Sequence, residues 1–190
     1  MKVIFTGAQG VGKTTLLDIL EKCVTLPIKF NYVRNFTRNL AKAGYAINEK
    51  GTDDTQLAIM NLHKQYAESD ENIVMDRCVL DGLAYTIYLN RRGRVTDETV
   101  NLCEHIFKEG IDKYDIIYYL KPEFPITGDE YRSNKVQYQS EIADIFEELI
   151  RKYSVKVTLL TGTVGDRLKG IQDTLGGIIR CWSHMKFRYL

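Results

Sequence analysis

A glycine-rich stretch near the start of the chain restricts the fold more than any other feature of the sequence. Residues 2–6 form an apolar run rich in β-formers, Leu16 to Leu20 begin a helical pattern, and between them lies Gly7-x-x-x-x-Gly12-Lys13-Thr14. This is the full spelling of a P-loop in the strand–loop–helix context that such a loop requires. The glycines let the backbone wrap closely around a polyphosphate, whose charge the helix N-terminus favours. We therefore expect this loop to bind a nucleoside triphosphate.

The residue types of the loop also predict how the triphosphate is held. Lys13 would bridge the β- and γ-phosphates and take part in catalysis, and the Thr14 hydroxyl would ligate Mg²⁺. Backbone N–H groups would point inward at the phosphates. The predicted ATP-binding residues are Gly7, Ala8, Gln9, Gly10, Val11, Gly12, Lys13, Thr14 and Thr15.

Composition is consistent with a compact enzyme. A length of 190 residues suggests a single domain over residues 1–190. The 26 basic and 25 acidic residues leave a net charge of +1, so no overall field draws the chain to nucleic acid or membrane. The 4 cysteines lack metal-ligand spacing and are typical of reduced thiols. With no signal peptide and no run of membrane-spanning length, we expect a cytoplasmic protein.

Beyond the P-loop, short β-rich runs alternate with helical patterns. Strands are expected at 2–6, 29–33, 73–75, 115–120 and 155–160. Helices are expected at 13–23, 36–43, about 80–91, 136–153 and 166–173, and two further helices should begin at 53 and at 96. This alternation predicts a doubly wound, five-stranded parallel sheet with right-handed crossovers. Ligands of such sheets bind at the carboxyl ends of the strands, so the site should lie there.

Two arginines follow the second predicted strand. Arg34 and Arg38 are one helical turn apart at the ligand edge, and arginine forks match phosphate oxygens. They therefore indicate an acceptor that carries a phosphate, although two solvated surface arginines would have the same spacing. No carboxylate occupies this strand end, which is a place where a kinase acting on a free hydroxyl can hold its base.

A second polar pair, Asp76-Arg77, follows the third predicted strand. The aspartate is well placed to hold Mg²⁺ through water or to accept a proton, and the arginine to face the phosphates. Alternatively, the aspartate caps the next helix and the arginine pairs with it. Asp-Arg before a helix bearing Ala84-Tyr85 resembles thymidylate kinases and the related deoxynucleoside kinases, as does an arginine after the second strand. The resemblance implies that Asp76, Arg77 and Tyr85, with Arg34, bind the acceptor.

A polar stretch at 124–135 follows the fourth predicted strand and resembles a lid over the phosphates. Its Asp129-x-x-Arg132 is similar to the lid of the nicotinamide riboside kinase domain and its small P-loop relatives, many of them phage-encoded. That resemblance implies that Arg132 stabilises the charge of the transferring phosphoryl group, with Lys135 as a lesser helper. An ordinary exposed loop is the alternative.

The last residues, 176–190, interleave aromatic and basic side chains. Such a tail could stack nucleic-acid bases, but we expect it to pack against the domain or a second subunit, as in a homodimer.

Three classes of function remain. We expect an ATP- and Mg-dependent kinase, with a (deoxy)nucleoside monophosphate as the favoured acceptor because of Arg34 and Arg38. The alternative is a kinase that acts on a hydroxyl of a nucleoside, nicotinamide riboside included, or of DNA or RNA; neutral net charge disfavours nucleic acid. A non-catalytic switch or a hydrolase ranks last, because the chain appears self-contained with its own lid arginine.

Overall fold

The computed structural model describes residues 1–23, 28–123 and 136–186. In these residues the chain forms one sheet of β1 (Lys2–Thr6), β2 (Asn31–Val33), β3 (Ile73–Asp76), β4 (Ile116–Leu120) and β5 (Thr158–Leu160). The strand order is β2-β3-β1-β4-β5, and every neighbouring pair is parallel. The predicted doubly wound, five-stranded sheet is confirmed.

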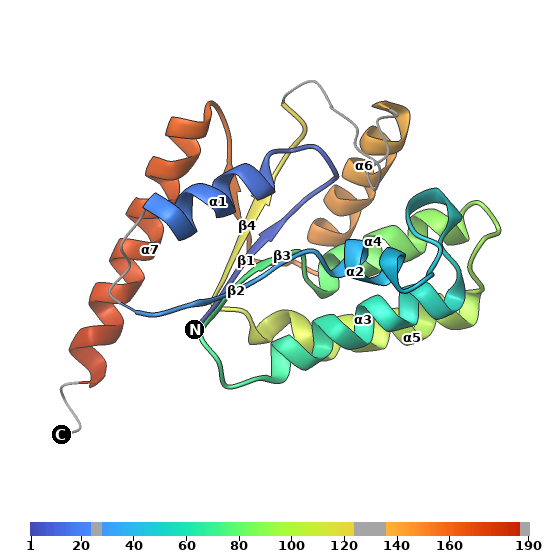
Figure 1. Ribbon diagram of the computed structural model, residues 1–190, viewed down its shortest axis with the longest axis horizontal. Coiled ribbons are helices and arrows are strands. Elements are labelled where there is room, and N and C mark those ends of the chain that lie inside the picture. Colours follow the sequence, from blue (N-terminus) through green and yellow to red (C-terminus); the bar gives the residue numbers. More distant parts are fainter. Residues whose placement is uncertain (24–27, 124–135, 187–190) are drawn as a thin grey trace.

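Helices cover both faces of the sheet (Figure 1). On one side lie α1 (Lys13–Cys23) and α7 (Val164–Lys186), which contact each other. On the other side α3 to α6 pack together, with the short α2 against α3. Their bounds are α2 (Phe36–Lys42), α3 (Asp53–Glu68), α4 (Val79–Asn90), α5 (Asp97–Gly110) and α6 (Val136–Lys152); two 3₁₀ turns, η1 (Asn48–Lys50) and η2 (Ile111–Lys113), complete the described elements.

The centre of the sheet is buried on both faces. All five residues of β4 are buried, as expected for the apolar run that predicted it. Phe5 of β1 stacks against Tyr118 of β4 with ring centroids 5.1 Å apart. The strands β1 and β4 are therefore rigid supports for the loops that follow them.

The predicted start of the third helix is correct: α3 begins at Asp53, and Thr52 caps it, because its hydroxyl accepts a hydrogen bond from the Thr55 N–H. The predicted end of the last helix is wrong. This helix does not stop at residue 173 but runs from Val164 to Lys186 and includes most of the predicted tail. The glycines at 176–177 do not end it, since a glycine inside a helix costs only about 1 kcal/mol. Within the described residues, no helix is both long and apolar enough to cross a membrane.

Candidate active site

The P-loop follows β1 and has the backbone that its glycines permit. Gly7 has a φ of 132°, and a Cβ placed there would lie 2.3 Å from the Leu120 carbonyl oxygen. Only glycine fits so close to the neighbouring strand. The loop is thus seated against the end of β4, and it turns into α1 at Lys13.

Lys13 is folded into the loop. Its ammonium Nζ donates hydrogen bonds to the carbonyl oxygens of Gly7, at 2.6 Å, and Ala8, at 2.8 Å. The side chain is buried, whereas Thr14 and Thr15 are exposed at the start of α1. The loop therefore presents a cation and hydroxyl groups together at a helix N-terminus, where they suit a polyphosphate.

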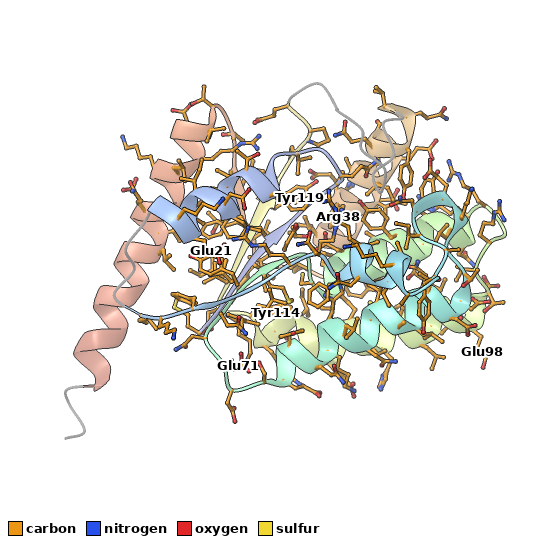
Figure 2. The ribbon with its side chains drawn as sticks, viewed as in Figure 1. Glu21, Arg38, Glu71, Glu98, Tyr114 and Tyr119 are labelled. Atoms are coloured by element: carbon orange, nitrogen blue, oxygen red, sulfur yellow. The ribbon has the colours of Figure 1, made fainter. Side chains whose placement is uncertain are left out.

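A pocket opens from the P-loop toward the acceptor side of the sheet. It lies among the loop, α2, α3 and the start of α4. Arg38, labelled in Figure 2, belongs to α2 and lines this pocket. The predicted residues that line it are Gln9, Gly10, Val11, Gly12, Lys13, Thr14, Thr15, Arg38, Asp76, Arg77 and Tyr85. The structure thus brings together most of the residues predicted for the donor and acceptor sites.

Asp76 and Asp81 have different environments in this pocket. The Oδ1 atom of Asp76 is buried and has no hydrogen-bond partner. Asp81 is fully engaged: it accepts hydrogen bonds from the Thr6 hydroxyl at 2.6 Å, the Cys78 N–H at 3.0 Å and Arg77 at 3.2 Å. The alternative considered from the sequence, in which Asp76 caps α4 and pairs with Arg77, is not realised: Cys78 is the N-cap, and Asp81 accepts a hydrogen bond from its N–H and pairs with Arg77. Asp76 is left available for chemistry.

The same residues bear on whether Mg²⁺ fits. Carboxylate and hydroxyl oxygens are the ligands that Mg²⁺ prefers, and it usually keeps several waters. The exposed Thr14 hydroxyl and the unpartnered Asp76 Oδ1 line one pocket. These two residues fit an ion held partly through water, so Thr14 and Asp76 as metal ligands stay a prediction.

Arg77 is held in a strained backbone position, with a φ of 77°. Its guanidinium lies over the Tyr85 ring, 4.9 Å from the centroid, besides its bond to Asp81. The Tyr85 hydroxyl in turn donates to Gln9 Oε1 at 3.1 Å, and the Gln139 amide donates to the Gln9 carbonyl at 2.7 Å. The predicted residues Gln9, Arg77 and Tyr85 are therefore linked across the P-loop, α4 and α6.

Arg34 departs from its predicted role. The sequence placed it with Arg38 at the acceptor phosphate, but it forms ion pairs with Asp18 and Glu21 of α1 and donates to the Leu17 carbonyl. It does not line the pocket, whereas Arg38 does. The one-turn spacing failed because Arg34 precedes α2, and Asn35 between them has a left-handed φ of 64°.

Sequence reasoning missed the inner wall of the pocket. Gln56, Ile59 and His63 project from one face of α3, and Phe36 packs edge-on against His63 at 5.2 Å between ring centroids. Burial, with a smaller contribution from the positive charge of Arg77, lowers the pKa of His63 to about 3, so its imidazole is neutral. Polar residues at i and i+7 within an apolar helix stripe were the available signal. They give the pocket an uncharged end suited to a heterocyclic ring.

A buried arginine of α7 also reaches the P-loop. Arg167 is 1% exposed, donates to the Val11 carbonyl oxygen at 2.6 Å and pairs with Glu123, just after β4, at 2.6 Å. No local pattern indicates this contact, since 156 residues separate its partners.

Some predicted residues fall outside the described part of the chain. These are the lid residues of 124–135, including Asp129, Arg132 and Lys135. Of the predicted tail, 176–186 belong to α7.

Comparison with known families supports the assignment of the fold. Residues 2–167 match the family model described as an AAA domain. The chain belongs to this family. No curated protein matches this AAA-domain chain.

Solved structures similar to this AAA-domain chain include a deoxyadenosine kinase, a thymidylate kinase and the NadR protein. Deoxyadenosine kinase from M. mycoides, solved with dCMP and dCDP, has a TM-score of 0.69 at 17% identity over 94% of this chain and 100% of its own. NadR with NR has a TM-score of 0.69 at 16% identity, over 90% of this chain and 51% of its own. Thymidylate kinase from Candida albicans has a TM-score of 0.56 at 17% identity, over 95% and 91%. The fold is therefore that of the P-loop nucleoside and nucleotide kinases.

Proposed function

We propose that this chain is a kinase that transfers the γ-phosphoryl group of ATP to a hydroxyl of a nucleoside-type acceptor, in an Mg-dependent reaction. The observation that carries the choice of acceptor is Asp76, whose buried Oδ1 lacks a partner at the edge of the pocket. A hydroxyl must lose a proton as it attacks phosphorus, and a positioned carboxylate can accept it. A deoxyadenosine kinase of similar fold supports the same reaction class.

This proposal reverses the order of acceptors expected from the sequence. A nucleoside monophosphate was favoured because Arg34 and Arg38 would bind its phosphate together. Arg34 instead forms ion pairs with two acidic residues of α1. Arg38 alone lines the pocket and keeps the monophosphate as the second candidate. Nucleic acid, a switch and a hydrolase gain no support from the geometry.

Each pocket residue has a defined task in this reaction. Lys13 leaves the Gly7 and Ala8 carbonyls to contact the phosphates, and Arg77, fixed by Asp81, faces the group in transfer. Thr14 would hold Mg²⁺ directly and Asp76 only through water, so that the Asp76 carboxylate can also accept the proton of the hydroxyl; the ion would neutralise phosphate charge when bound. The uncharged wall of Gln56, Ile59 and His63 receives the ring of the acceptor, and Arg132 acts from the predicted lid.

The test is a panel of nucleosides, their 5′-monophosphates and short oligonucleotides, incubated with labelled ATP and Mg²⁺. We expect label on a nucleoside, with transfer lost in Lys13→Ala. Asp76→Asn should reduce kcat at least a hundredfold on the nucleoside, since general-base catalysis contributes roughly 10²–10⁴-fold. Label on monophosphates alone, with Asp76→Asn nearly normal and Arg38→Ala impaired, would replace this proposal by the monophosphate kinase.

A further inference from the structure

The P-loop is held from behind by an arginine that does not reach the pocket. Arg167 is the largest fully buried side chain among the described residues, and a buried charge is costly unless it is paired and hydrogen-bonded. One of its nitrogens, Nη1, donates to the Val11 carbonyl oxygen at 2.6 Å, while Nη2 contacts Glu123 Oε2 at 2.6 Å. A guanidinium suits this task because its planar fork serves two acceptors in fixed directions.

Glu123 extends this contact to a third part of the chain. The same Oε2 atom accepts a hydrogen bond from the Gly162 N–H at 3.0 Å, in the turn that follows β5. Arg167 and Glu123 therefore join the P-loop, the segment after β4 and the turn before α7. We call this set of contacts the Arg167 brace.

The brace acts on the part of the loop that matters most for phosphate. Val11 and Gly12 immediately precede Lys13, and a peptide unit whose carbonyl is held on one side turns its N–H to the other. Nη1 lies 3.4 Å from the point where a Cβ of Gly12 would be, so the positive charge sits directly beneath the loop. Arg167 thus fixes the carbonyl direction and adds positive potential to an anion site.

We propose that Arg167 is a positioning residue for the triphosphate: it holds the Val11–Gly12 backbone in the phosphate-binding conformation without touching the ligand. The proposal concerns ATP binding at the proposed donor site and does not depend on which acceptor is used. It predicts that the loss of Arg167 weakens binding of the phosphates of ATP but not binding of its nucleoside part.

Dissociation constants of ATP, ADP and adenosine, each with Mg²⁺, test the proposal in the full-length chain. Arg167→Met retains much of the side-chain volume but donates no hydrogen bond. We expect its ATP constant to rise roughly tenfold or more, because hydrogen bonds that involve charged groups are the strong ones. The adenosine constant should change less than twofold. Arg167→Lys, which keeps one donor and the charge, should lie between wild type and Arg167→Met.

A matched control variant exists, and three results would overturn the proposal. The control is Arg34→Met, which removes a partly buried arginine that has two carboxylate partners. Arg34 lies outside the pocket, so the dissociation constant of ATP for this variant should equal that of wild type. Unchanged ATP affinity in folded Arg167→Met overturns the proposal, as does an equal loss for ATP and adenosine. If Arg167→Met does not fold, Arg167→Lys with wild-type ATP affinity overturns it. A wild-type chain that binds ATP but labels no acceptor would refute the proposed function and leave this measurement intact.

Discussion

At the scale of single residues, two arginines that follow the same strand have different environments. Arg38 of α2 lines the pocket, whereas Arg34 has only 15% of its side chain exposed and is held by Asp18 and Glu21. An ion pair of this kind supports the junction of β2 with α1 and leaves the ligand untouched.

We therefore expect Arg38→Ala and Arg34→Ala to affect different measurements. Arg38→Ala should raise the KM of the acceptor several-fold, and more for a monophosphate than for the nucleoside, because only the former has a charge to grip. Arg34→Ala should lower the free energy of unfolding by about 1 kcal/mol, with kinetics unchanged. An acceptor KM raised by Arg34→Ala but not by Arg38→Ala would restore the role that the sequence predicted.

His63 makes stability depend on pH. Its pKa is about 3 in the folded chain, against 6.5 when unfolded, so below pH 6.5 protons bind the unfolded state preferentially. Stability from the neutral, buried imidazole is thus complete above pH 6.5 and falls by up to about 1.4 kcal/mol per pH unit below it. Denaturation at pH 7 and pH 5.5 measures this loss. His63→Gln, which does not titrate, should lose less between the two values, and an identical loss would contradict the burial argument.

At the scale of elements, the P-loop depends on its fit against β4. Gly7→Ala would add a methyl group 2.3 Å from the Leu120 carbonyl oxygen at a φ of 132°. We expect a loss of unfolding free energy on the order of 2–4 kcal/mol, from backbone strain and displacement of the strand. Gly44→Ala is the control, because Gly44 also has a positive φ, 93°, but nothing within 4 Å of the added carbon. Denaturant unfolding of both variants should show the larger loss at Gly7.

The elements also show what a sequence can predict. The strand at 116–120 has its own apolar run and the helix at 13–23 its own apolar periodicity, so these elements and the ligand edge were predictable from local pattern. The environment of Asp81, the partner of Arg77, was not, because Asp81 is held by the Thr6 hydroxyl of β1, 75 residues away. Arg34 likewise has the sequence position of a ligand-binding residue, but in the folded chain it pairs with the acidic side chains of α1. Local pattern carries no information about such distant contacts.

At the scale of the whole molecule, nucleotide binding should be measurable as stability. A ligand that binds only the folded chain at a hundred times its dissociation constant adds about 2.7 kcal/mol. For a chain of this size that corresponds to a rise in Tm of roughly 5–11 °C. We expect this rise with ATP and Mg²⁺, a much smaller one with ATP and EDTA, and none in Lys13→Ala. An equal rise with EDTA would show that binding does not need the metal.

The Arg167 brace has a consequence for how the protein is made. Synthesis proceeds from the N-terminus, so the P-loop leaves the ribosome well before α7 does. Its support comes from α7, and the hydrogen bond to Val11 spans 156 residues. A nascent chain can form the β1 strand and the loop first, but on this proposal it cannot complete the triphosphate site until α7 has emerged. Competence to bind ATP is therefore expected only after α7 has been made.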